Sequence, residues 1–113
     1  MDSHVLPELP ASINFISQYT DITSGLEQQI ETIARNHLLK FQTSYLKPYL
    51  HKPDAQVIVT MYFSKNKQER YEGKFKFVFD SEEFYRTNDI PFKEPLDLVN
   101  HAFQHLKEYL ADK

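Results

Sequence analysis

The sequence predicts an α+β fold, a two-layer sandwich with the order β-α-β-β-β-α. Apolar residues recur at three- and four-residue intervals over 24–41 and again over 95–110, which predicts two amphipathic helices. Between these segments apolar and polar residues alternate over 57–63 and 71–79, which predicts strands with one buried face. Because each element must bury its apolar side, we expect a mixed, mostly antiparallel sheet with both helices on one face.

The first strand is expected over 12–17, where apolar residues follow two prolines. Thr23 or Ser24 can cap the first helix, and Ser24 with Glu27 fits the capping-box pattern. The helix should end before Pro48, and 45–54 should form the longest connection. Pro95 fits the first turn of the last helix.

The polar segment 64–70 lies between two alternating runs, so it predicts a hairpin loop. A further strand is expected over 83–87, but its register stays open because Phe84 and Tyr85 compete for the buried face. The sheet face away from the helices should be open to solvent. It should carry Ile58, Thr60, Tyr62, Lys74, Lys76 and Val78.

A chain of 113 residues is sufficient for one core, so we expect a flexible N-terminal tail over 1–11 and a single domain over 12–113. The absence of cysteine excludes disulfides and thiolate chemistry. No apolar run approaches the ~20 residues of a membrane helix, and the first ten residues do not resemble a signal peptide. These features predict a cytoplasmic protein without a membrane partner.

Charge is distributed unevenly along the chain, although the net charge is only -3. Residues 40–76 hold eight basic and three acidic side chains. Residues 1–39 hold one basic and five acidic side chains, and residues 77–113 hold four and eight. Such segregation can guide an anionic partner to the basic middle of the chain, although lysines that merely solvate a hairpin would give the same pattern.

The sequence offers no set of residues that indicates catalysis, so we expect a protein that is not an enzyme. Two glycines cannot form a phosphate-binding glycine loop, and no cofactor or small-molecule substrate is expected. His101 and His105 have the spacing of a zinc pair, but no general-base glutamate and no third ligand accompany them. We interpret them as solvent-exposed polar residues and predict no metal site. His37 is interpreted as a packing residue.

Two local patterns resemble a known family, the ribosome hibernation-promoting factors, also called ribosome-associated inhibitors or sigma-54 modulation proteins. Its members open with a strand and an Ile-Thr pair that caps a helix, as Ile22-Thr23-Ser24-Gly25-Leu26 would here. Near the C-terminus they have an Asp followed by an apolar helix, as Pro95-Leu96-Asp97-Leu98-Val99 would here. The element order agrees from about residue 13 to residue 110, and the chain resembles the short form of the family.

The resemblance implies a non-enzymatic translation inhibitor, a stress-response hibernation factor that binds the 16S rRNA of the 30S ribosomal subunit near the decoding centre. RNA contacts of this kind depend on basic side chains at phosphates. The residues expected to bind RNA are Arg35, Lys40, Lys65, Lys67, Arg70, Lys74, Lys76, His101, His105 and Lys107.

The last helix departs from the family pattern, because His101, Gln104 and His105 stand where lysine or arginine would be expected. An alternative is therefore a protein-interaction or regulatory module that has kept the fold and lost RNA binding. A second hypothesis concerns pH, because protonation of the two exposed histidines would restore positive charge to this helix. A generic RNA-recognition domain is disfavoured, since that fold ends in a strand.

Overall fold

The structure is a computed structural model that describes residues 6–50, 54–79, 82–87 and 91–112. Its elements follow the predicted order. They are β1 (Ile13–Thr20), α1 (Ser24–Gln42), a short 3-10 helix η1 (Lys47–Tyr49), β2 (Val57–Lys65), β3 (Tyr71–Phe79), β4 (Glu82–Thr87) and α2 (Pro95–Ala111).

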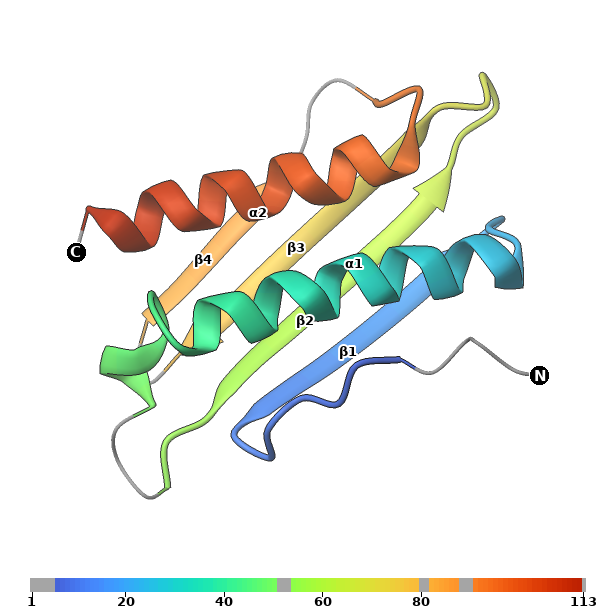
Figure 1. Cartoon of the computed structure of the whole chain (residues 1–113). Coiled ribbons are helices and arrows are strands. Elements are labelled where there is room, and N and C mark those ends of the chain that lie inside the picture. The colour runs from blue at the N-terminus through green and yellow to red at the C-terminus, as the bar shows by residue number, and fades with distance from the viewer. Residues whose placement is uncertain (1–5, 51–53, 80–81, 88–90, 113) are drawn as a thin grey trace.

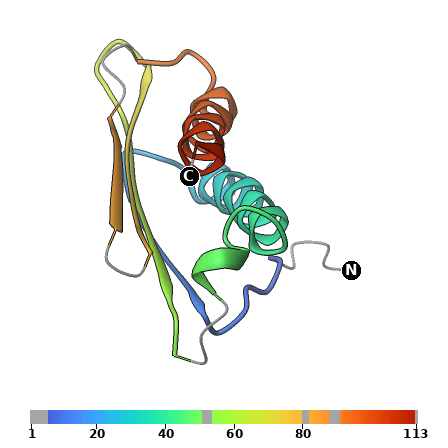
Figure 2. The same ribbon diagram turned by 90° about the vertical axis from the view of Figure 1, so that its left-hand side faces the viewer.

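The four strands form one mixed sheet in the order β1-β2-β3-β4. β1 pairs with β2 in parallel, because α1 carries the chain back across the sheet, and the other two pairs are antiparallel. Both helices lie on one face and leave the other face bare (Figures 1 and 2). The predicted fold class and helix placement are confirmed.

β1 extends three residues beyond the predicted 12–17 and pairs with β2 as far as Thr20. The predicted strand was too short because Ser17 and Tyr19, which face the helices, are not purely apolar residues. Both hydroxyls donate to Glu31 of α1, at 2.8 Å from Ser17 and 3.2 Å from Tyr19. Burial raises the pKa of the Tyr19 phenol, so this side chain stays a neutral donor.

Helix α1 is capped by Thr23, whose Oγ1 accepts a hydrogen bond from the Leu26 amide at 3.3 Å. Ser24 is already inside the helix, so the capping box predicted for Ser24 and Glu27 is not the cap that forms. The helix ends at Gln42, before Pro48 as expected. The following connection contains η1, while residues 51–53 of the predicted loop lie outside the described residues.

The core lies between the helices and the inner face of the sheet and is rich in phenylalanine. Phe103 of α2 is 1% exposed, and its ring contacts the rings of His37, Phe41 and Phe77. His37 stacks on Phe103 at 4.7 Å and donates from Nε2 to Asn100 Oδ1 at 2.7 Å. His37 is thus a packing residue that joins α1 to α2, as predicted.

The strand before the hairpin extends two residues beyond the predicted 57–63, because Ser64 and Lys65 still pair with Glu72 and Tyr71, whereas β3 spans 71–79 as predicted. β4 also resolves the register that the sequence left open. Phe84 faces the helices and contacts the rings of Phe77 and Tyr109, whereas Tyr85 points away and is 63% exposed.

Residues 6–10 run beside α1 before β1 begins (Figure 1). Leu9 packs against the core, and the Pro10 carbonyl accepts a hydrogen bond from the Ile13 amide at 2.9 Å. Residues 1–5 lie outside the described residues, so the flexible tail over 1–11 stays a prediction.

Phe103→Ala should lower the free energy of unfolding by about 3–5 kcal/mol, since it removes a fully buried ring that joins both helices to the sheet. Denaturant titration followed by circular dichroism measures this loss. Gln104→Ala, at an exposed neighbouring position on the same helix, should change stability by about 0.5 kcal/mol or less. Equal effects of the two substitutions would contradict this account of the core.

Candidate nucleic-acid interface

The sheet face that points away from the helices, here called the open face, is built by alternate residues of all four strands. The pairing of the strands arranges them in rows. One row is Gln18, Tyr62, Lys74 and Thr87; the next is Ile16, Thr60, Lys76 and Tyr85; a third is Asn14, Ile58, Val78 and Glu83. The six open-face residues predicted from the sequence all lie in these rows.

The exposed large hydrophobic side chains of the described residues all lie on the open face. They are Ile16 at 42%, Tyr62 at 45% and Tyr85 at 63% exposure. Lys76 holds its ammonium group 5.5 Å from the centre of the Tyr85 ring. Hydrogen bonding to Tyr85, supported by the charge of Glu83, raises the pKa of Lys76, so this lysine is cationic at neutral pH.

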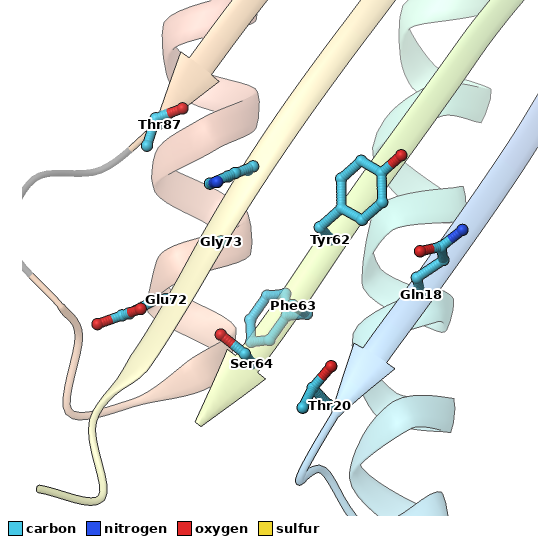
Figure 3. Close-up of a pocket in the computed structure, with 9 residues that line it drawn as sticks. Gln18, Thr20, Tyr62, Phe63, Ser64, Glu72, Gly73 and Thr87 are labelled. Carbon is cyan, nitrogen blue, oxygen red and sulfur yellow. The ribbon is translucent and has the colours of Figure 1, made fainter. Parts of the chain in front are cut away.

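A shallow pocket of about 390 Å³ lies on the open face toward the hairpin end of the sheet (Figure 3). Amide, hydroxyl and charged groups from all four strands line it, and apolar surface that includes the ring of Tyr62 forms the larger part of the wall. Gly73 faces the helices, where an added Cβ would meet Leu98, so only its backbone can line the pocket. The lining residues are Gln18, Thr20, Tyr62, Phe63, Ser64, Glu72, Gly73, Lys74 and Thr87.

The β2–β3 turn, residues 66–70, is ordered by one asparagine. Asn66 Oδ1 accepts hydrogen bonds from the amides of Gln68 and Arg70 at 2.9 and 3.0 Å, and the Asn66 amide donates to the Arg70 carbonyl at 2.8 Å. Asparagine favours this arrangement because its short side chain can replace backbone partners in a turn. Glu69 has a φ of 59°, so the turn also contains a left-handed residue.

Three predicted RNA-binding residues, Lys65, Lys67 and Arg70, lie on this turn or beside it, and we call them the basic hairpin. Lys67 and Arg70 are exposed, and neither forms an ion pair with any residue that the structure describes. Lys65 is 3.7 Å from Glu69 and 5.9 Å from the centre of the Tyr71 ring. Exposed ion pairs of this kind are weak, so Lys65 is still available to a stronger anion.

The predicted residues of the helices do not join the basic hairpin. Arg35 is held by Glu31 at 3.9 Å, by the Pro7 carbonyl at 3.5 Å and over the Phe15 ring at 5.3 Å. Lys40 in the last turn of α1 and Lys107 on α2 are exposed, but both belong to the helix layer. The ten predicted residues therefore fall into separate groups, and the open face and basic hairpin hold five of them.

The prediction that His101 and His105 are solvent-exposed is wrong, because both are half-buried where α2 meets β4. His101 Nε2 lies 3.2 Å from Arg86 Nη2 and 3.0 Å from His105 Nε2, and its ring contacts Phe92 at 5.3 Å. No pattern in the sequence indicates this contact, because the pairing of β4 with β3 is what brings Arg86 to α2.

Which nitrogen atoms of this cluster carry protons follows from which groups can only donate hydrogen bonds. Arginine can only donate, so His101 Nε2 is the acceptor, and the proton between the two histidines belongs to His105. His105 Nδ1 is 3.7 Å from Glu108. Burial lowers the pKa of His101, and electrostatic repulsion from the neighbouring His105 and Arg86 lowers it further. These surroundings oppose the protonation of His101 on which the pH hypothesis depends, and the hypothesis itself stays a prediction.

No helix in the described part of the chain is long and apolar enough to cross a membrane. Within the same residues, no group of three or more histidine or acidic side chains is arranged to hold a metal ion. The Arg86 Nε is buried and has no hydrogen-bond partner among the described residues.

Comparisons with known proteins give one structural neighbour of note. No protein-family model matches the chain, and no curated protein matches its sequence. Among solved structures it is similar to the N-terminal domain of Thermus thermophilus Protein Y, with 10% sequence identity and a TM-score of 0.48. The match covers 86% of this chain and 91% of that domain.

His101 should make stability depend on pH. Its folded-state pKa lies below the ordinary value of 6.5, so the unfolded chain takes up a proton first as the pH falls. The free energy of unfolding should therefore decrease from pH 7 toward pH 5. His101→Gln, which keeps an acceptor for Arg86, should show a smaller decrease in denaturant titrations. Identical pH slopes for the two proteins would contradict this account of the cluster.

Proposed function

We propose that this protein is a non-enzymatic, ribosome-associated translation inhibitor of the hibernation type, located in the cytoplasm, that binds 16S rRNA of the small ribosomal subunit. Two lines of reasoning support the proposal. One is that the segments 22–26 and 95–99 resemble the corresponding segments of the hibernation-promoting factors. The other is the distribution of positive charge on the folded chain.

The observation that carries the proposal is the set of cations without ion pairs at one end of the sheet. Lys67, Arg70 and Lys74 are exposed, and no carboxylate among the described residues forms an ion pair with them. An ordered turn presents the first two, so their backbone needs little further ordering when they bind an anion. Phosphates are the ligands that such a set of cations favours.

Binding of this kind requires no covalent chemistry. A small folded domain that occupies the path of messenger or transfer RNA on the small subunit can silence a ribosome by exclusion alone. Structured RNA is recognised mainly by its shape and its phosphates, so a basic hairpin beside a bare sheet face is a suitable contact. The protein would bind when idle subunits are free and leave when salt or competing ligands displace it.

The competing function is a protein-interaction module that has lost RNA binding. The observation in its favour is the character of α2, whose exposed residues include Asp97 and Glu108 and whose His101 is engaged with Arg86 and His105. If α2 were the required contact, RNA affinity would be lost. Our proposal places the contact on the basic hairpin and open face instead.

Sedimentation with purified 30S subunits in sucrose gradients tests the proposal. At low salt the protein should migrate with the subunit, and at high salt it should stay at the top of the gradient, because phosphate contacts release counterions. An in vitro translation reaction should be inhibited over the same salt range. Failure to bind at low salt, or binding that ignores salt, would favour the interaction module.

The double variant Lys67→Gln and Arg70→Gln should weaken subunit binding and reduce the slope of log affinity against log salt by about one for each lost phosphate contact. Titrations at several salt concentrations measure both quantities. Lys47→Gln is the control, because Lys47 is exposed on η1, whose Tyr49 packs against Phe79 at the opposite end of β3. A double variant with an unchanged slope would exclude the basic hairpin as the contact.

A further inference from the structure

We propose that the open face binds a single-stranded segment of RNA, with bases stacked on Tyr62 and Tyr85 and phosphates neutralised by Lys74 and Lys76. The inference rests on the proposed function for the identity of the ligand as RNA. It adds a binding mode to that function, since a face that stacks bases recognises unpaired nucleotides rather than the shape of a duplex.

The exposure of the rings is the first observation. A tyrosine on a sheet can bury its ring against neighbours, yet Tyr62 and Tyr85 are 45% and 63% exposed on a face that no other element covers. Among the described residues, Ile16 is the only other large hydrophobic side chain that is exposed to a similar degree. Every base has a π-face, so an exposed ring can accept any of the four.

The pairing of each tyrosine with a lysine is the second observation. Tyr62 lies directly opposite Lys74 on the neighbouring strand, and Tyr85 lies directly opposite Lys76. The same aromatic and cationic pair therefore occurs twice, in adjacent rows of the open face. From ordinary strand spacings the two tyrosine Cα atoms are roughly 12 Å apart, so one short strand of RNA can reach both.

The pocket beside Tyr62 supplies the third observation. Gln18, Thr20, Ser64 and Thr87 present amide and hydroxyl groups around it, and these groups can both donate and accept hydrogen bonds. Such groups suit the edges of a flipped base and the ribose 2′-hydroxyl. The volume of about 390 Å³ is within the usual range of small-molecule sites.

The layout of this face and the charge beside it favour RNA over a protein partner. Lys74 and Lys76 separate the two exposed tyrosine rings, which therefore do not form the continuous apolar patch that a protein interface places at its centre. On the face itself these lysines are balanced by Glu72, which accepts a hydrogen bond from Asn66 at 3.1 Å, and by Glu83. The net positive charge therefore comes from the basic hairpin next to the pocket, which attracts an anionic strand to this end of the sheet.

Fluorescence anisotropy with a labelled ten-nucleotide single-stranded oligoribonucleotide at low salt tests the inference. Tyr62→Ala and Tyr85→Ala should each weaken binding by about 5- to 150-fold, the range for loss of one stacked base. Tyr62→Phe and Tyr85→Phe should retain most of the affinity, because the ring remains. Tyr62→Leu and Tyr85→Leu keep an apolar side chain but not a ring, so they should behave like the alanine variants.

A duplex of the same sequence is the control ligand, and it should bind more weakly because its bases are not accessible. Equal binding of duplex and single strand would overturn the inference, as would alanine variants with unchanged affinity. Leucine variants that bind like the wild-type protein would show that apolar contact, not stacking, holds the RNA, and would also overturn it. Both tyrosines are exposed, so these variants should fold, which circular dichroism verifies.

The inference and the proposed function fail in different ways. If the wild-type protein sediments with 30S subunits at low salt but does not bind the oligoribonucleotide, the stacking inference is wrong and the proposed function stands. If the oligoribonucleotide binds as expected but the subunits do not, the open face is a single-strand site and the ribosomal role is wrong. A dimer that Tyr62→Ala or Tyr85→Ala dissociates would identify the face as a contact between copies and overturn the inference.

Discussion

The packing of two helices against one aromatic sheet face is the constraint on which the rest of the structure depends. Phe75, Phe77 and Phe79 point toward the helices from a single strand, and each is 2% exposed or less. Because side chains alternate along a strand, the burial of this set turns the residues between them outward. Lys74, Lys76 and the two exposed tyrosines of the open face are thus placed by the core behind them.

The positive charges of the chain have two different roles in the fold. Arg35 and Arg86 are tied to neighbours within the domain, the first between Glu31 and Phe15 and the second against His101. Lys74 and the exposed residues of the basic hairpin form no ion pair with the described residues, and Lys76 contacts only the exposed ring of Tyr85 among the aromatic side chains. A protein with a net charge of -3 can therefore still present a local cationic surface to RNA.

The sequence was sufficient for the fold class, the element order and the six open-face residues predicted from it, because these follow from the periods of apolar residues. It was insufficient where polar groups are buried through contacts between residues that are far apart in the sequence. Ser17 and Tyr19 continue β1 only because Glu31 accepts from both, and His101 is half-buried only because β4 brings Arg86 to it. Tyr85 could not be assigned to the open face, since Phe84 has an equal claim on the core until the register is known.

Hydroxyl-radical footprinting of the protein bound to 30S subunits tests the central claim most directly, because it reports which side chains RNA covers. Tyrosine and histidine are both readily oxidised, so the open face and α2 can be compared within one experiment. Our account predicts protection of Tyr62 and Tyr85 on binding, with His105 and Tyr109 of α2 as reactive as in the free protein. Protection of the α2 residues with Tyr62 and Tyr85 still reactive would contradict it.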